Sequence, residues 1–384
     1  MTIATRAPVY APVRVLMLYL TEDCNLRCTY CFVNKKPRRM TSETARRTVE
    51  FFLDRNISGA ETELNISFFG GEPFLELDRM EEVIAIARER RPNVYKTIKF
   101  AATTNGTVSG PRVERIVKET AMPLLVSLDG DHRAAEHRPF VSGRGSYELV
   151  ARNLPKLVEW SPNVVVRMTF HPDALDFVGN VRHALELGAP SVALCPVVEA
   201  SWQGHEEALK AAYTALADEY IDQARRGRLL PLEITHQLLV DLHSRRRPAR
   251  PCSAGQALLS VDPDGNVMPC HRFLYRRSDW LGNVRERQLD ERRWDYVHLS
   301  SQDILGCDTC PAQTVCGGGC RLLAVAAGQK LETGANPTEC MLMRAHAAAV
   351  HRIYETLTAE GNQVFLGSLR RGRPHPSLAG LLES

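Results

Sequence analysis

The sequence has little of what directs a chain to a membrane, to an export route or to nucleic acid. Its first residues, MTIATRAPVYAPVRVLMLYL, lack a long apolar segment followed by a small-residue cleavage site, and no run of about eighteen apolar residues occurs anywhere. The formal net charge is only +3, so composition gives no strong electrostatic argument for nucleic-acid binding. We therefore expect a cytoplasmic protein that binds neither nucleic acid nor membranes.

The cysteine content is the most informative feature that is present. The chain has 11 cysteines among 384 residues, and ten of them fall in clusters with short spacings, while Cys195 stands alone. An odd total of cysteines, most of them at short spacings in a chain without an export signal, favours metal ligation over a disulfide framework. For Cys195 we expect a buried core position, because a free cysteine behaves as a small hydrophobic residue.

The first half of the chain alternates short apolar runs with helical patterns. This alternation predicts parallel strands joined by helical crossovers, in an α/β fold of the partial (β/α)6 TIM barrel type over residues 15–203. The six expected strands are 15–21, 64–69, 97–105, 123–130, 163–170 and 191–198. Informative polar residues follow several of these strands, at the edge where parallel α/β folds place their active sites.

The remaining segments differ in composition. Residues 1–14 precede the first expected strand, and residues 204–248 show apolar residues at helical spacing, which predicts a bridge of two amphipathic helices. From 249 to 345 glycine, proline and cysteine increase, which predicts a small cysteine-rich domain in which metal replaces a large core. Residues 346–384 are expected to form a C-terminal helix and tail.

Three cysteines lie in one short loop after the first expected strand, in TEDCNLRCTYCF. The spacing of Cys24, Cys28 and Cys31 lets three thiolates bind three irons of a [4Fe-4S] cube and leaves the fourth iron an open position. A zinc ion with three protein ligands and a water is the alternative.

This motif resembles the signature of radical S-adenosylmethionine (SAM) enzymes. The match includes YLTEDCNL, which contains Cys24, and Tyr30 and Phe32 on either side of Cys31. The resemblance implies that the open iron binds the amino and carboxylate groups of SAM. It also implies that one electron from the cluster cleaves SAM to a 5′-deoxyadenosyl radical.

Further motifs match the same family at the ends of successive strands. They are GGEP at 70–73, TTNGT at 103–107 and SLDG at 127–130, followed by Arg138. Glycines in the first motif allow the backbone to approach the SAM amino group, and Arg138 with Ser127 would bind the SAM carboxylate. The resemblance implies these cofactor-binding residues: Tyr30, Phe32, Gly70, Gly71, Glu72, Pro73, Thr104, Asn105, Ser127, Asp129 and Arg138.

Seven cysteines near the C-terminus have spacings that resemble the SPASM extension of radical SAM enzymes, which carries two auxiliary [4Fe-4S] clusters. The resemblance implies three clusters in all, with one auxiliary cluster on Cys252, Cys270 and Cys320 and the other on Cys307, Cys310, Cys316 and Cys340. Two four-iron clusters take eight ligands, and seven cysteines are one too few. A distant side chain, water or the substrate would complete the cluster on Cys252, Cys270 and Cys320. A pair of zinc ribbons is the alternative.

SPASM enzymes mostly act on peptides and proteins, and GNVMPCHRF resembles maturases that install crosslinks in ribosomally made peptides (RiPPs). Formylglycine formation by an anaerobic sulfatase maturase is the alternative, although His271 stands where that group has an aspartate base. An iron-sulfur electron carrier without SAM turnover is a third possibility.

We expect three kinds of partner: a peptide or protein substrate, a reductant such as flavodoxin or ferredoxin, and a separate leader-binding protein. Because the first strand begins near residue 15, there is no room for an N-terminal leader-binding module. Recognition of a leader would need this separate protein, the open side of the barrel, or basic loops such as NKKPRR at 34–39. No side chain stands out as the general base.

Overall fold

The computed structural model describes residues 12–54, 63–90, 97–245, 252–286, 288–300, 304, 306–328, 330–332 and 336–370. Strands in this part of the chain form one sheet in the order β6-β5-β4-β3-β2-β1-β7-β8-β9. Neighbouring strands from β6 to β7 are parallel, and β7, β8 and β9 pair antiparallel.

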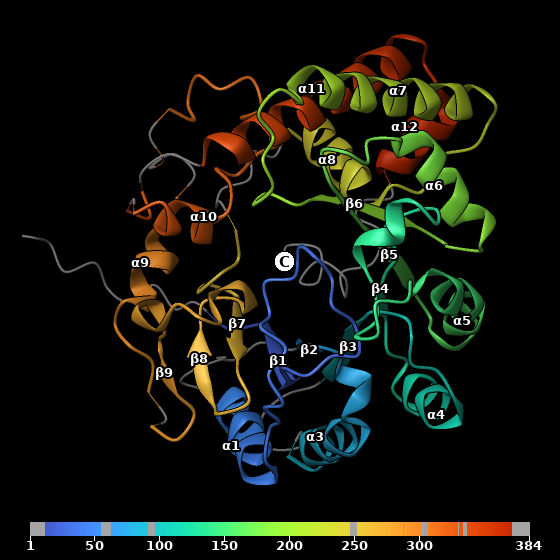
Figure 1. The fold of residues 1–384 in the computed structure, drawn as a ribbon. Coiled ribbons are helices and arrows are strands. Elements are labelled where there is room, and N and C mark those ends of the chain that lie inside the picture. Colours follow the sequence, from blue (N-terminus) through green and yellow to red (C-terminus); the bar gives the residue numbers. More distant parts are fainter. Residues whose placement is uncertain are drawn as a thin grey trace, which may run out of the picture.

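The first six strands alternate with helices, so the expected α/β fold with a parallel sheet is confirmed. The strands are β1 (Val15–Thr21), β2 (Glu63–Gly70), β3 (Thr97–Thr104), β4 (Leu124–Ser127), β5 (Val164–Phe170) and β6 (Val192–Pro196). The helices are α1 (Ser42–Leu53), α3 (Leu77–Arg90), α4 (Pro111–Thr120), α5 (Tyr147–Trp160) and α6 (Phe177–Glu186). In Figure 1 the strands follow one another around an arc, with these helices on its outer side.

The strands form two cores because successive side chains point to opposite faces of a sheet. Leu16, Leu18 and Leu20 of β1 face the outer helices, whereas Met17 and Tyr19 face the inner side. All five side chains are 0% exposed, so both faces of the strand are dry. This double burial explains why the strands read as nearly continuous apolar runs.

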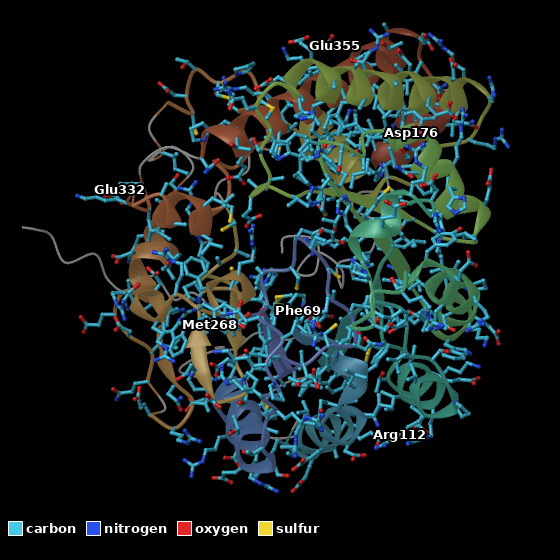
Figure 2. All side chains as sticks on the ribbon, in the orientation of Figure 1. Phe69, Arg112, Asp176, Met268, Glu332 and Glu355 are labelled. Carbon is cyan, nitrogen blue, oxygen red and sulfur yellow. The ribbon has the colours of Figure 1, made fainter. Side chains whose placement is uncertain are left out.

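The cysteine-rich segment contributes three strands that the sequence does not predict: β7 (Leu258–Val261), β8 (Asn266–Met268) and β9 (Gly282–Asn283). They extend the sheet beyond β1. Leu258, Met268 and Phe273 join the inner core, which Phe69 and Met268 mark in Figure 2. This segment therefore contributes apolar packing of its own, in addition to its cysteines.

Short helices complete the cysteine-rich segment and the strand connections. They are η1 (Pro73–Leu75), η3 (Ala134–His137), η4 (His271–Phe273), η5 (Arg277–Asp279), α9 (Arg293–His298) and α10 (Arg321–Ala326).

Four longer helices lie beyond β6 (Figure 1). They are α7 (Glu206–Arg225), α8 (Glu233–His243), α11 (Pro337–Ala359) and α12 (Gln363–Arg370). Helix α11 packs along α7 and also contacts α8. The expected boundary between residues 345 and 346 falls inside α11, and the expected tail beyond residue 370 lies outside the described residues. None of the described helices has the length and hydrophobicity needed to cross a bilayer.

Candidate functional site

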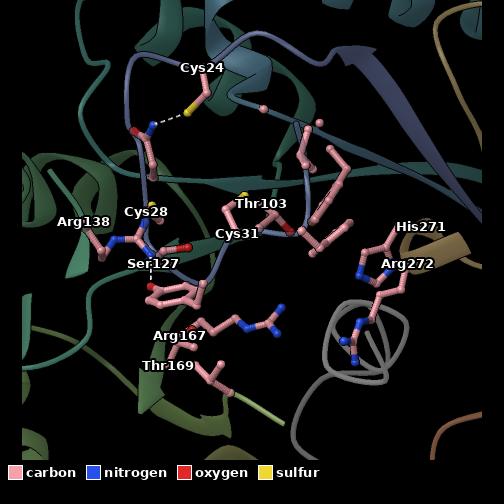
Figure 3. A pocket seen from close by; sticks show the side chains of 18 of the residues that line it. Cys24, Cys28, Cys31, Thr103, Ser127, Arg138, Arg167, Thr169, His271 and Arg272 are labelled. Atoms are coloured by element: carbon pink, nitrogen blue, oxygen red, sulfur yellow. Dashed lines mark hydrogen bonds between the residues drawn. The ribbon is translucent and has the colours of Figure 1, made fainter. Parts of the chain in front are cut away.

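A cavity opens at the carboxyl ends of the parallel strands, where the sequence places its motifs (Figure 3). The three cysteines of the first loop line it together with part of the expected cofactor-binding set, namely Tyr30, Phe32, Gly70, Gly71, Thr104, Asn105, Ser127 and Arg138. Glu72, Pro73 and Asp129, which belong to the same expected set, are not among the lining residues. They are buried behind the cavity wall.

Backbone hydrogen bonds hold the cysteine loop against the end of β2. The N–H of Gly71 donates to the carbonyl of Thr21 at 2.9 Å, and the N–H of Glu72 donates to the carbonyl of Asp23 at 2.9 Å. The other side of the loop is tied to the segment before α5, since the N–H of Arg27 donates to the carbonyl of Pro139 at 2.7 Å. The loop is therefore positioned by contacts on both sides.

The two glycines of GGEP are required by this close approach. A Cβ atom at Gly71 would lie 2.0 Å from the carbonyl oxygen of Asp23. A Cβ at Gly70 would lie 2.2 Å from the carbonyl oxygen of Thr21, and the φ angle of Gly70 is +136°. No side chain larger than hydrogen fits either position without moving the backbone.

Glu72 links the GGEP loop to the loop after β3. Its carboxylate accepts hydrogen bonds from the backbone N–H groups of Phe74 at 3.0 Å and Asn105 at 2.7 Å, and from the hydroxyl of Thr104 at 2.9 Å. Burial raises the pKa of Glu72 to about 7, although these three hydrogen bonds oppose the rise. Glu72 thus positions two loops that line the cavity.

A buried network holds Arg138 in the cavity wall. The Arg138 guanidinium donates to the Tyr30 hydroxyl at 2.7 Å, and that hydroxyl donates to the Asp129 carboxylate at 2.5 Å. Burial raises the pKa of Asp129, and Arg138 opposes the rise. The Nε atom of Arg138 is buried and has no hydrogen-bond partner among the described residues. Arg138 therefore keeps a donor for an anionic group in the cavity.

The three thiols of the loop have limited help from the protein in becoming thiolates. Burial raises the pKa of Cys24 to about 11. Burial also raises the pKa of Cys28, where Arg138 opposes the rise, and Lys35 donates a hydrogen bond to the Cys31 sulfur. A bound iron cation would supply the remaining positive charge that thiolates need.

The sequence does not predict the opposite wall of the cavity. Arg167 extends from β5 into the cavity, on the side where His271 and Arg272 lie (Figure 3). The His271 ring is 1% exposed, and its Nδ1 atom has no partner in the described part of the chain. Burial, together with the positive charge of Arg167, lowers the pKa of His271 to about 3.

Two signals in the sequence could have revealed further lining residues of the cavity. Arg167 is the single charged residue within the apolar strand VVVRMTF, and Thr103 belongs to the TTNGT motif. Thr103 lines the cavity, and no described residue hydrogen-bonds to its buried hydroxyl, whereas the hydroxyl of Thr104 is occupied by Glu72.

Several of the downstream thiols lie close enough to influence one another electrostatically. Burial raises the pKa of Cys270, and the adjacent thiols of Cys320 and Cys252 raise it further. In the group of four expected from the sequence, burial raises the pKa of Cys340, to which the nearby Cys307 and Cys310 add. Cys307 and Cys340 likewise add to the effect of burial on the pKa of Cys316. The lone Cys195 is the next-to-last residue of β6 and is only partly buried, so the expected buried core position is wrong; it is not among the cavity-lining residues.

Residues 18–176 match the radical SAM superfamily, and they contain the three-cysteine loop, both glycines and Arg138. This segment is a radical SAM domain.

Three curated relatives have similar sequences. The radical SAM cyclopropyl synthase TigE of Paramaledivibacter caminithermalis is 24% identical over 78% of this chain and 65% of its own length. The serine-type anaerobic sulfatase-maturating enzyme of Klebsiella aerogenes is 26% identical over 84% of this chain and 82% of its own. A PqqA peptide cyclase of Xanthomonas campestris is 25% identical over 81% of this chain and 82% of its own.

Other relatives are longer than the matched region. The match covers 50% of the length of an uncharacterized protein of Methanocaldococcus jannaschii and 65% of the length of TigE. The chain therefore spans less than two thirds of each of these two relatives.

Two solved structures share the fold. The structure of anSMEcpe with bound AdoMet has a TM-score of 0.72 at 17% identity and covers 94% of this chain and 100% of that chain. Streptococcus suis SuiB bound to its precursor peptide SuiA has a TM-score of 0.59 at 15% identity, over 86% and 76% of the two chains. Both therefore extend the likeness beyond the radical SAM domain, into the cysteine-rich segment.

Proposed function

We propose that this protein uses its radical SAM domain to modify a peptide or protein side chain. The observation that carries the proposal is the cavity itself, in which three cysteines of one loop face unpartnered polar atoms of Arg138 and Thr103. Three thiols without a fourth suit a [4Fe-4S] cluster that keeps one iron free for SAM. When bound, the cluster and SAM would supply a 5′-deoxyadenosyl radical that abstracts a hydrogen atom from carbon.

The lining residues fit the polar groups of SAM. The glycine backbone at 70–71 lies close to the cysteine loop, where it would receive the SAM amino group. Ser127 and the free Nε of Arg138 would bind the carboxylate, and the unpartnered hydroxyl of Thr103 is available for the ribose. Thr104 and Asn105 would act by holding the loop, because their side chains already bond Glu72, Asn25 and Thr107. Tyr30 and Phe32 border this region.

Three residues of the expected set would act from behind the wall. Glu72 orients the backbone of the loop after β3, and Asp129 orients Arg138 through Tyr30. Pro73 begins the turn that places Glu72.

We further propose the finer architecture: a partial (β/α)6 barrel over 15–203, a helical bridge over 204–248, a SPASM domain over 249–345 and a C-terminal segment after it. The separation of the downstream cysteines into a group of three and a group of four supports two auxiliary [4Fe-4S] clusters. Zinc ribbons would account for the four-cysteine group alone, because a closed structural zinc site takes four ligands.

The substrate that we favour is a ribosomally made precursor peptide that receives a crosslink. The likeness to a PqqA peptide cyclase and to SuiB bound to its precursor peptide supports this class. Crosslinking removes two hydrogens from the peptide. One is transferred to the deoxyadenosyl group, and the other leaves as a proton to a base and an electron to an acceptor of the iron-sulfur class.

Formylglycine formation is the second candidate, and the sulfatase-maturating relative favours it. In this reaction a group near the substrate must accept a proton. The imidazole of His271 lies in the cavity wall with one nitrogen unpartnered, but its pKa of about 3 makes it a weak proton acceptor, which counts against this second candidate.

We propose two partners: a reductant, which the chemistry requires, and a leader-binding protein, which a precursor-peptide substrate suggests. The cluster needs an electron for each SAM cleaved, so a reductant such as flavodoxin or ferredoxin would supply it. A separate leader-binding protein would deliver the precursor peptide.

Mass spectrometry of a co-expressed peptide tests the proposal. The probe is a short peptide encoded next to the gene, and the control is a variant with Cys24, Cys28 and Cys31 all changed to alanine. We expect the peptide to become lighter by about two hydrogens per crosslink with the unaltered protein and to stay unchanged with the control. Conversion of a cysteine or serine of a neighbouring sulfatase to formylglycine would favour the second candidate. An unmodified peptide during active SAM turnover would contradict peptide crosslinking.

A further inference from the structure

The two groups of downstream cysteines differ in their number of ligands. Cys307, Cys310, Cys316 and Cys340 can saturate one four-iron cube, because each iron takes one protein ligand. Cys252, Cys270 and Cys320 leave one iron of a second cube without a protein ligand. The question is which other side chain lies close enough to complete this group.

Glu339 lies between the two groups, since its charge adds to the burial that raises the pKa of Cys320 in the group of three and of Cys316 and Cys340 in the group of four. Because the group of four is already complete, only the group of three can take a further ligand. The Asn336 side chain caps helix α11 and accepts a hydrogen bond from the Glu339 N–H at 3.3 Å. The Oε1 atom of Glu339 accepts a hydrogen bond from the N–H of Cys320 at 2.8 Å. The carboxylate is thus attached directly to the backbone of one of the three cysteines.

The second oxygen of the same carboxylate has no role in the packing. Oε2 of Glu339 is buried and has no hydrogen-bond partner among the described residues. A buried unpartnered carboxylate oxygen is costly and is expected to contact a cation or a donor.

Neighbouring arginines do not satisfy this oxygen. Arg321 is fully buried, and its guanidinium donates to backbone carbonyls, to Leu331 at 2.5 Å, to Gly319 at 3.3 Å and to Gly318. Arg272 forms its ion pair with Glu199 on the cavity wall. Both arginines lie near enough to influence Glu339 electrostatically, but neither donates a hydrogen bond to Oε2.

We propose that Oε2 of Glu339 is the fourth protein ligand of the iron-sulfur cluster on Cys252, Cys270 and Cys320. The inference rests on the auxiliary clusters of the proposed function. Because all its irons then have protein ligands, this cluster does not bind the substrate directly and serves in electron transfer. Carboxylates bind iron as hard anionic oxygen ligands, so this site differs from the four-thiolate site beside it.

Pulsed electron paramagnetic resonance of the reduced protein tests the ligand. The background variant has Cys24, Cys28 and Cys31 changed to alanine, so that the auxiliary clusters alone contribute, with about eight irons per chain. The probe is water enriched in the oxygen-17 isotope. Glu339→Gln keeps an oxygen acceptor for the Cys320 N–H but loses the anionic ligand, and Glu355→Gln, an exposed glutamate on the same helix, is the matched control.

We expect no oxygen-17 coupling from bound water in the background or in Glu355→Gln, and a new coupling in Glu339→Gln. Glu339→Cys should abolish the coupling again, because a thiolate replaces the carboxylate. Oxygen-17 coupling from water in the background variant would overturn the inference. So would the absence of this coupling from Glu339→Gln when its iron content is unchanged.

Changes in iron content separate the remaining outcomes. Loss of one cluster from Glu339→Gln that Glu339→Cys restores supports ligation, whereas loss from both variants contradicts it. If the background variant holds far fewer than about eight irons per chain, it does not contain two auxiliary four-iron clusters. That result would contradict both the inference and the auxiliary clusters of the proposed function.

Discussion

Gly71 has the tightest backbone approach in the site, because any Cβ there would lie 2.0 Å from the carbonyl oxygen of Asp23. The same carbonyl accepts the N–H of Glu72, so the cysteine loop and the GGEP loop share one contact. At the residue scale, SAM binding and cluster assembly therefore depend on the absence of a side chain as well as on the thiols.

The substitution Gly71→Ala tests this close approach. We expect a stability loss of about 1–3 kcal/mol and SAM binding weaker by about tenfold or more, because the added methyl group forces the two loops apart. Thermal unfolding and anaerobic equilibrium dialysis with SAM measure the two effects. Gly145→Ala is the control, since a Cβ at Gly145 meets no atom within 4 Å. Equal behaviour of the two variants would refute the steric argument.

The Tyr30 hydroxyl is a second position where one atom connects charged groups. Tyr30→Phe keeps the ring but removes the bridge between Arg138 and Asp129. Breaking a buried hydrogen bond to a charged group costs about 1–3 kcal/mol, so we expect SAM affinity to fall about 5- to 100-fold at unchanged iron content.

Tyr147→Phe is the control for this prediction, because it removes a tyrosine hydroxyl that lies 2.6 Å from His183, outside the cavity lining. Unchanged SAM affinity in Tyr30→Phe would show that Arg138 is held without the bridge. Loss of iron would instead assign Tyr30 to the cluster.

At the element scale, α11 connects parts of the molecule that the sequence separates. Its first turn carries Glu339 and Cys340 beside the cysteine groups, and its later turns pack along α7 and α8. His346 lies at this packing contact, fully buried, 3.0 Å from the Thr235 hydroxyl and stacked on Tyr213.

This buried histidine predicts an acid-sensitive contact. Burial lowers the pKa of His346 to about 4, so the unfolded chain takes up a proton below pH about 6.5 while the folded chain stays neutral. Its contribution to stability is complete above pH about 6.5 and is lost as the pH falls toward 4. A separation of about 2.5 pH units at about 1.4 kcal/mol per unit gives an upper value of about 3 kcal/mol.

The measurement is the unfolding temperature between pH 7 and 4 (about the interval in which a histidine titrates). We expect the wild-type profile to fall more steeply than that of His346→Gln, whose amide can still bond Thr235. His351→Gln on the same helix is the control and should keep the wild-type slope. Parallel profiles for all three proteins would exclude His346 as the cause.

The sequence predicts the parallel sheet well because its strands are buried on both faces and its helices carry clear apolar stripes. It does not predict β7, β8 and β9, which are four, three and two residues long. Strands so short carry almost no periodic signal, and tertiary contacts with β1 determine their pairing.

The candidate site divides in the same way. Motifs that depend on local spacing, such as the cysteine loop and GGEP, can be read from the chain. The position of His271 after Cys270 already marks it as a site residue, but its burial is not visible in the sequence. The roles of Arg167 and Glu339 cannot be read from the chain, because each depends on which partners the fold brings near or leaves out. An unpartnered atom is a property of the packed molecule and has no local sequence signal.

For the whole molecule, the fold places the loop of Cys24, Cys28 and Cys31 at the carboxyl ends of the parallel strands. The other clustered cysteines lie in the segment whose strands β7, β8 and β9 extend the sheet. One wall of the cavity therefore carries the cysteine loop and the motifs expected to bind SAM, and the other wall carries Arg167, His271 and Arg272. A substrate between the two walls would lie beside the proposed SAM site. The proposed function therefore depends on SAM cleavage at the loop of Cys24, Cys28 and Cys31.

Anaerobic incubation of the iron-loaded protein with SAM and dithionite, followed by chromatography of the nucleoside products, tests this claim most directly. We predict formation of 5′-deoxyadenosine and methionine by the unaltered chain. No such products are expected from a variant in which Cys24, Cys28 and Cys31 are alanine and the downstream cysteines are intact. An iron-loaded protein that forms no 5′-deoxyadenosine, or equal formation by the variant, would contradict the account.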